Sequence, residues 1–208
     1  MSTNLGRATL QMLDYDVDGP PRPDDLAILS APLTSMLTTE LDEARQYLRL
    51  TVEELVLAAV ARTIARTIGT GDMSVDLLGE GEATVTLACT TVGEVSATKA
   101  VRAAHRALTG ARRRVGRLTS AASDVAISYL LGAHEPMRRQ MLPSDGHALE
   151  LRVYRSGGVL QMDWWYDTRR LERSTVDELA EQFPLALIEL TSEAAPMLRD
   201  AAEMVMVS

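Results

Sequence analysis

The stretch from Ala148 to Asp167, ALELRVYRSGGVLQMDWWYD, constrains the fold of this chain more than any other part. Apolar and polar residues alternate on both sides of Ser156-Gly157-Gly158. Small turn residues between two alternating runs are a strong signal of a β-hairpin. The sequence therefore predicts two antiparallel strands here.

Further strands and helices are predicted along the rest of the chain. Short apolar or β-branched runs indicate strands near residues 26–31, 73–78, 83–92 and 124–132. Apolar residues at helical spacing indicate helices near residues 5–13, 34–48, 51–68, 97–108 and from 174 or 175 onward. Periodicity alone therefore predicts a domain of mixed α and β structure.

The helix predicted over 51–68 has clear start and stop signals. Thr51 and Glu54 have the spacing of a capping box, in which each side chain bonds the other residue's backbone N–H group. Gly69 follows the apolar pattern and is placed to end the helix. One face of this helix repeats the apolar residues Leu57, Val60, Ala61, Ile64 and Ile68. That face is expected to lie on the core.

The helix near the carboxyl end shows a similar pattern. Ser174 or Thr175 together with Glu178 could form a second capping box. The residues expected to be buried are Val176, Leu179, Phe183, Leu187 and Leu190. Pro184 lies inside this pattern and removes a backbone hydrogen bond, so it predicts a kink.

The length of 208 residues fits one domain with a sizeable core. We expect an N-terminal helix and Pro-rich linker over 1–25, the domain over 26–193, and a tail or helix extension over 194–208. Residues 14–25, DYDVDGPPRPDD, open like a calcium-binding loop, but prolines fill the part that must wrap the ion. The sequence therefore favours a linker there and predicts no metal site.

Charge and cysteine content narrow the class of protein. The net charge of −8 argues against nucleic-acid binding as the main role. Cys89 is the only cysteine and lies in a strand pattern, which indicates a buried structural thiol and a reducing compartment. The chain shows neither an apolar run long enough to cross a membrane nor a signal-peptide core. A cytoplasmic protein is expected.

Three segments contain side chains that could take part in catalysis or ligand binding. The loop after the strand near 73–78 combines Leu78, Gly79, Glu80 and Gly81 with Glu82, so it is either an acid–base site or a polar turn. His147 follows a turn that contains Asp145, a carboxylate that could orient an imidazole.

The third feature is basic. Arg112, Arg113, Arg114 and Arg117 could hold a phosphate, for example on a carrier-protein arm, or could simply end a helix with favourable charge. His105 lies on the preceding helix beside Arg102 and Arg106, which indicates a solvated face. His105, His134 and His147 are too far apart to match a metal-binding spacing.

Four stretches in the same order resemble the second half of the condensation and epimerization domains of nonribosomal peptide synthetases. They are the helix pair leading to VDLLGEGE, the segment TTVGEVSA, the strand ISYLLG, and the closing hairpin and helix GGVLQMDWWYDTRRLERSTVDELAEQF. Together they cover roughly residues 26–192. The resemblance implies a chloramphenicol acetyltransferase-like half-domain, an α/β two-layer sandwich in which helices cover a mixed sheet.

The resemblance also assigns positions to a tunnel between the two halves of the family's domain. Leu78, Gly79, Glu80 and Gly81 match the family's glycine loop, while Ser128 and Tyr129 match its tunnel strand. Leu78 stands where the epimerization domains carry a proton-handling Glu, and leucine cannot hold a proton. The family's tunnel Asn is also absent, with Tyr129 or Leu130 near that place.

The family's His-His-x-x-x-Asp-Gly string does not occur in this sequence. The resemblance therefore implies no catalytic residue, and His147, Asp145 and Glu80 are the remaining candidates. It implies a non-catalytic half that binds a carrier protein, a synthetase module or a complementary half, and that oligomerises. It implies no cofactor of its own, although a phosphopantetheine-loaded carrier is a possible partner.

Two alternatives stay open. The chain could be one component of an acyl- or peptidyl-transferase whose active site another chain completes. It could also be a piece of a larger synthetase.

Overall fold

The computed structural model describes residues 10–78, 82–112, 123–130, 142–143 and 146–196. Six strands are β1 (Leu26–Ser30), β2 (Gly71–Leu78), β3 (Ala83–Cys89), β4 (Val125–Leu130), β5 (Leu149–Ser156) and β6 (Val159–Asp167). The described helices are α1 (Ser35–Leu48), α2 (Val52–Thr67), α3 (Ala97–Arg112) and α5 (Arg173–Glu193), and a 3₁₀ turn spans Pro23–Asp25. The mixed α and β content expected from periodicity is confirmed.

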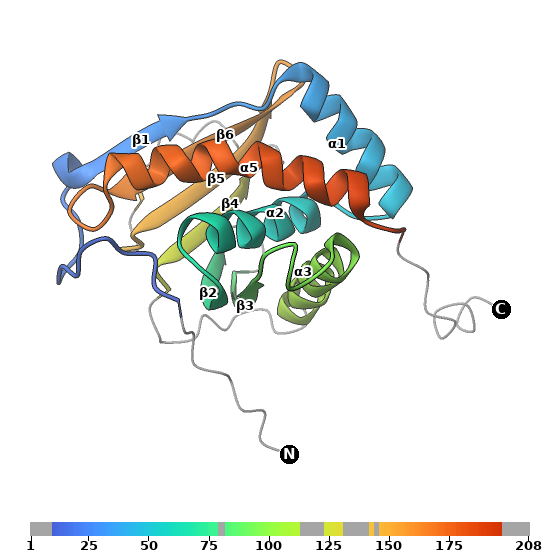
Figure 1. The fold of residues 1–208 in the computed structure, drawn as a ribbon. Helices are drawn as coiled ribbons and strands as arrows, with labels where there is room; N and C mark the ends of the chain where they lie inside the picture. The colour runs from blue at the N-terminus through green and yellow to red at the C-terminus, as the bar shows by residue number, and fades with distance from the viewer. Residues whose placement is uncertain (1–9, 79–81, 113–122, 131–141, 144–145, 197–208) are drawn as a thin grey trace.

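The strands form one mixed sheet in the order β1-β6-β5-β4-β2-β3. The central pairs β5–β4 and β4–β2 are parallel, and the outer pairs are antiparallel. Helices α2, α3 and α5 lie together on one side of this sheet (Figure 1). The result is the expected two-layer α/β sandwich with helices over a mixed sheet.

Local sequence signals explain the start of α2 and the turn between β5 and β6. The Thr51 hydroxyl accepts a bond from Glu54 N–H (3.2 Å), and the Glu54 carboxylate accepts one from Thr51 N–H (2.7 Å), so the predicted capping box is confirmed. In the hairpin between β5 and β6, Gly157 and Gly158 have φ values of 59° and 81°. Glycine adopts these left-handed values without steric cost, which allows the tight turn.

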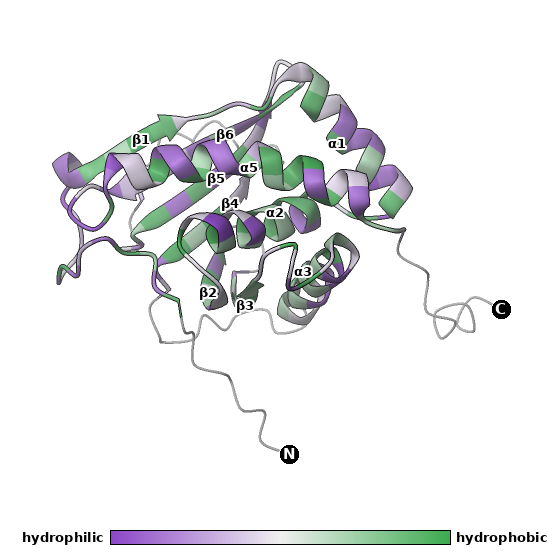
Figure 2. Ribbon diagram, viewed as in Figure 1, coloured by the Kyte–Doolittle hydropathy of each residue, from purple (hydrophilic) through white to green (hydrophobic). Residues whose placement is uncertain are grey.

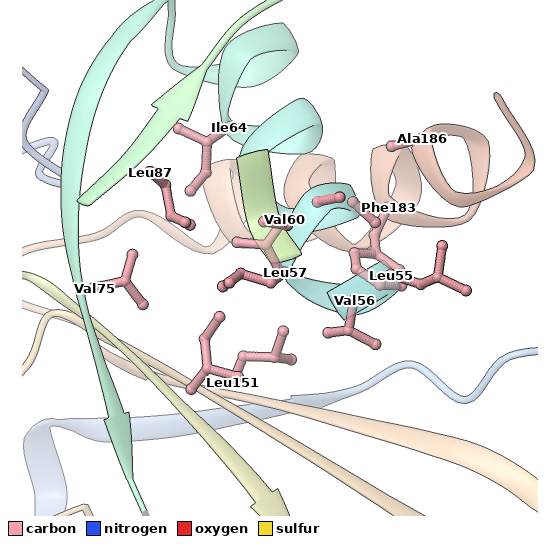
Figure 3. Close-up of a cluster of buried hydrophobic side chains, with 14 of the residues drawn as sticks. Leu55, Val56, Leu57, Val60, Ile64, Val75, Leu87, Leu151, Phe183 and Ala186 are labelled. Atoms are coloured by element: carbon pink, nitrogen blue, oxygen red, sulfur yellow. The ribbon is translucent and has the colours of Figure 1, made fainter. Parts of the chain in front are cut away.

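The core lies between the sheet and the helices. Figure 3 shows Leu57, Val60 and Ile64 of α2 among Val75, Leu87 and Leu151 of the sheet. Trp164 of β6 meets Phe183 of α5 edge to face, with ring centroids 6.1 Å apart. Figure 2 shows α1 and α5 banded by hydrophobic and hydrophilic residues, as expected for helices with one face on a core.

Helix α5 differs in part from its prediction. The five residues expected to be buried along it are all buried. The expected capping box is wrong, because the helix begins at Arg173 after Glu172, and no side chain caps its N-terminus. Pro184 lies inside a single continuous helix.

The segment before β1 packs against the domain. Met12 is fully buried, Leu10 N–H donates to the Asp72 carbonyl (2.9 Å), and Asp14 N–H donates to the Arg170 carbonyl (2.8 Å). Residues 10–13 are not helical, so the described end of the helix expected over 5–13 is wrong.

Candidate functional site on the polar face of the sheet

The side of the sheet opposite α2, α3 and α5 carries a band of polar side chains. Because side chains alternate along a strand, every second residue of each strand points to this side, which we call the polar face. The band consists of Ser30 of β1, Asp163 and Trp165 of β6, Glu150, Arg152 and Tyr154 of β5, Ser128 of β4, Asp76 of β2 and Thr84 of β3. Several of these are nearly inaccessible to solvent, so their partners decide what they can do.

A buried ion pair lies at the centre of the polar face. Arg152 Nε donates to Glu150 Oε1 (2.7 Å), and Arg152 Nη2 donates to Glu150 Oε2 (3.1 Å). Both residues are about 5% exposed. Ser128 Oγ donates to the same carboxylate (2.8 Å), and the Arg152 guanidinium lies 5.2 Å from the centroid of the Trp165 ring. Two hydrogen bonds from one guanidinium fix its orientation on the strand.

A second cluster surrounds Asp76. His147 Nε2 lies 3.0 Å from Asp76 Oδ2, while the hydroxyls of Thr84 (2.6 Å) and Ser123 (3.1 Å) donate to Asp76 Oδ1. Burial alone would raise the pKa of Asp76, but the hydrogen bonds from His147, Thr84 and Ser123 lower it below its ordinary value. The cluster therefore holds an ionised carboxylate beside an imidazole.

A third cluster joins β5, β6 and β1. Tyr154 Oη donates to Asp163 Oδ2 (2.8 Å), and Ser30 Oγ donates to Asp163 Oδ1 (2.6 Å). Both Asp163 and Tyr154 are buried. These bonds link three neighbouring strands, so polar contacts run across the sheet from β3 to β1.

The structure separates the residues assigned to the tunnel. Leu78 and Ser128 are direct register neighbours on β2 and β4 and both belong to the polar face. Tyr129 points to the helix side, where its hydroxyl donates to the Glu53 carbonyl of α2 (3.1 Å). Ser128 and Tyr129 therefore point to opposite sides of the sheet. Gly79, Glu80 and Gly81 lie outside the described residues.

The histidine candidates find carboxylates that are distant in sequence. His147 pairs with Asp76 of β2, while Asp145 lies outside the described residues. His105 of α3 has its Nδ1 atom 2.7 Å from Glu54 Oε1, and its side chain is 41% exposed. His105 is thus a paired surface residue rather than a free one. His134 and the arginines 113, 114 and 117 lie outside the described residues.

Cys89 is fully buried at the end of β3, as the sequence predicts. Burial raises the pKa of its thiol to about 12, so the reactive thiolate is scarce at neutral pH. Among the described residues, no group of three His, Cys, Asp or Glu side chains is placed to hold a metal ion. Within the same residues, no helix is long and apolar enough to span a membrane.

Sequence reasoning missed most of the polar face. The period-two pattern in LELRVY could have placed Glu150, Arg152 and Tyr154 on one side of a strand. No local signal could have joined them to Ser128 or Asp163, because those contacts depend on strand order and register.

The arrangement of strands and helices is shared with solved synthetase domains. The epimerization domain from the third module of tyrocidine synthetase B superposes with a TM-score of 0.72 at 13% identity, covering 91% of this chain and 53% of that one. The X-domain from teicoplanin biosynthesis superposes with a TM-score of 0.67 at 14% identity, covering 91% and 52%. The fold is that of one half of a condensation domain.

A solved condensation domain has the same arrangement of strands and helices. The first condensation domain of the CDA synthetase superposes with a TM-score of 0.61 at 17% identity, covering 88% of this chain and 48% of that one. In each case the condensation-like half matches about half of the solved chain. The half-domain expected from the sequence resemblance is therefore confirmed at the level of the fold.

Curated relatives place a similar segment inside a long synthase. One of the polypeptides of the phenolphthiocerol/phthiocerol polyketide synthase, from two strains of Mycobacterium tuberculosis and from Mycobacterium bovis, is 36% identical to this chain over 242 aligned positions. The alignment covers 92% of this chain but only 16% of the relatives' length. No model of a protein family matches the chain.

Proposed function

We propose that this condensation-like half is non-catalytic by itself and serves as a partner-binding or scaffold module in the assembly of a polyketide or nonribosomal peptide. Its partner is a carrier protein, a synthetase module or a complementary condensation-like half. The chain binds no cofactor of its own, and any phosphopantetheine belongs to the partner's carrier. We place the module in the cytoplasm, where it forms a homo- or hetero-oligomer.

The main support for this proposal is the fraction of each solved domain that the chain matches. The chain corresponds to 53%, 52% and 48% of three solved domains of this fold. A half that retains the framework but lacks the His-His-x-x-x-Asp-Gly string keeps the shape of the domain without its central chemistry. Such a half is suited to bind a second surface.

The state of the polar face supports the lack of independent catalysis. The Glu150 carboxylate already accepts hydrogen bonds from Arg152 and Ser128. The Asp76 carboxylate is likewise hydrogen-bonded, with His147, Thr84 and Ser123 as partners. A general base needs a proton-accepting atom within reach of its substrate. Carboxylates that are largely shielded from solvent and already paired are better suited to fix the sheet.

One observation favours a second function, a transferase component completed by another chain. The His147–Asp76 pair has the geometry of a base oriented by a carboxylate, with 3.0 Å between Nε2 and Oδ2. In this alternative, His147 would act on an acyl or peptidyl group brought by a partner.

The test combines the purified chain with a separately expressed first half that carries the missing string, and with a phosphopantetheine-loaded carrier domain. Light scattering and titration calorimetry measure complex formation, and product analysis on the loaded carriers measures condensation. Leu78→Arg changes the edge of the polar face. Leu185→Arg is the matched control, because Leu185 is 53% exposed on α5.

We expect a stable complex with at least one partner, and about a tenfold weaker complex for Leu78→Arg only. No product is expected from the chain alone. A monomer that binds neither partner contradicts the proposal. Condensation that His147→Ala abolishes, while partner binding persists, supports the transferase alternative instead.

A further inference from the structure

Helix α3 carries a positive surface on a negatively charged protein. Its residues, ATKAVRAAHRALTGAR, include no Asp or Glu, although the chain has a net charge of −8. Lys99, Arg102 and Arg106 are all exposed, and their spacing of three and four places them along one side of the helix. We call these three residues the basic stripe.

In the described part of the chain, the basic stripe has no ion-pair partner. Some exposed or half-exposed arginines elsewhere form ion pairs, such as Arg173 with Asp177 (3.3 Å) and Arg155 with Asp42 (2.6 Å), whereas the separate surface residues Arg22 and Arg49 form none with other described residues. None of the ion pairs among the described residues includes Lys99, Arg102 or Arg106. Within the described structure, the three charges are therefore available to an external anion.

A small pocket adjoins the stripe. It has a volume of about 110 Å³ and lies between α2, α3 and the edge strand β3. Ala100, Ala103 and Ala104 of α3 form one wall, and Ala58 and Ala61 of α2 form another. Short alanine side chains leave this space open, and Ala100 and Ala103 directly follow Lys99 and Arg102 in sequence.

Arg62, which lines the pocket, is held by several contacts. Arg62, about 1% exposed, donates to the carbonyls of Thr90 and Val95 (2.7 Å for Val95), and its Nε atom lies 3.2 Å from Glu189 Oε1. This buried cation is already neutralised, so the pocket itself favours an apolar group rather than an anion. Charge on the stripe and apolar space in the pocket are thus separate, adjacent features.

We infer that α3 and this pocket dock an acidic helix of a partner protein, one of whose apolar side chains enters the pocket. Charge complementarity selects a negative partner, and the pocket selects a protein side chain. Nucleic acid fits less well because it has no aliphatic side chain to enter the alanine-lined pocket. An anionic membrane also fits less well, since none of the large exposed apolar residues of the described chain lies on α3.

This inference rests on the proposed partner-binding function and names the surface that serves it. The test titrates the full chain with a synthetic helical peptide that carries a leucine stripe edged by glutamates, at low and high salt. Arg102→Glu with Arg106→Glu reverses two charges of the stripe. Arg22→Glu with Arg173→Glu is the charge-matched control on residues elsewhere on the surface.

Ala103→Leu is the second test variant, because it narrows the pocket without changing the charge. We expect the double reversal on α3 to weaken peptide binding about tenfold at low salt, with the difference shrinking at high salt. Ala103→Leu should weaken binding severalfold at both salt concentrations. The control pair should stay within about twofold of the original chain, and circular dichroism should show the same helix content in all variants.

Equal loss in the control pair, or no loss in either α3 variant, overturns the inference. Tighter binding to duplex DNA or to phosphatidylserine vesicles than to the peptide also overturns it. Binding of the complementary half, measured with Leu78→Arg, is a separate readout. If reversing the stripe leaves peptide binding unchanged while the complementary half still binds, the docking surface is wrong and the proposed function stands.

Discussion

The two faces of the sheet consist of the same strands but are stabilised in different ways. On the helix side, side chains such as Val75, Ile127 and Leu151 are buried among apolar neighbours. On the polar face, Glu150 and Arg152 are equally buried but are held by hydrogen bonds and charge. Burial of apolar side chains therefore stabilises the helix side, whereas burial of charged groups on the polar face has a desolvation cost that their hydrogen bonds and charge pairing must offset.

Magnitudes decide which face stabilises the fold. Full burial of one large apolar side chain contributes about 1.5–3 kcal/mol. A buried ion pair contributes close to nothing in net terms, because desolvation offsets the attraction between its charges. The helix side should supply the stability, while the hydrogen bonds of the polar face fix the strand register.

Replacing two adjacent tryptophans, one on each face of the sheet, should give the largest difference in stability. Trp164 is 2% exposed on the helix side against Phe183, while Trp165 is half-buried on the polar face beside Arg152. Trp164→Ala should lower the free energy of unfolding by about 3–5 kcal/mol. Trp165→Ala should lower it by about 1–2 kcal/mol, mainly through the lost cation–π contact.

Urea unfolding followed by circular dichroism measures both values. Should Trp164→Ala fail to fold, Trp164→Phe gives a smaller loss on the same face and can be set against Trp165→Phe. Equal losses at the two positions would mean that the faces do not differ as argued.

The buried ion pair gives the next largest effect. Arg152→Leu leaves the Glu150 carboxylate buried without its cation, which should cost about 3 kcal/mol in the free energy of unfolding. Replacing both residues by leucine removes the buried charge altogether and should recover most of that loss. The measurement is the same urea unfolding series, with the two single variants and the double variant compared in one cycle.

Recovery in the double variant is the decisive result. If the double variant is less stable than Arg152→Leu alone, then the pair is net stabilising and the polar face resembles the helix side more than we argue. Binding of a complementary half to the double variant would then show whether the pair also contributes to recognition.

The helix side could be predicted from the sequence because its signals are local. Helical spacing identified the five buried residues of α5 and, on α2, Leu57, Val60 and Ile64, whereas Ala61 and Ile68 are only partly buried. The capping box of Thr51 and Glu54 marked the start of α2. Glycines at the β5–β6 turn identified the hairpin. Each of these features depends on residues close together in the chain.

The polar face could not be predicted because its contacts join distant segments. Asp76 and His147 are 71 positions apart, and Ser30 and Asp163 are 133 apart. The start of α5 was misjudged for the same reason, since Asp14 accepts the Glu172 N–H group (2.7 Å) at the beginning of that helix. The motif alone also could not show that Ser128 and Tyr129 point to opposite sides of the sheet, because strand alternation decides this.

The pH dependence of stability gives the smallest and most specific test of the polar face. The lowered pKa of Asp76 means that its ionised form stabilises the folded state. That contribution is fully present above the ordinary unfolded value of about 3.9 and is lost as the pH falls through the lowered folded value. Asp76→Asn keeps an oxygen acceptor but removes the charge, so it should be less stable than the original chain near neutral pH.

The difference in stability between the two proteins should shrink as the pH falls from about 5 to about 2. Urea unfolding at a series of pH values measures it. Some acid sensitivity should remain in Asp76→Asn, because Asp167 has a pKa lowered in the same direction: burial would raise it, and the hydrogen bonds from Arg169 outweigh that effect. A difference that stays constant over this range would mean that Asp76 acts only through the shape of its hydrogen bonds, since only an ionised carboxylate makes the gap depend on pH.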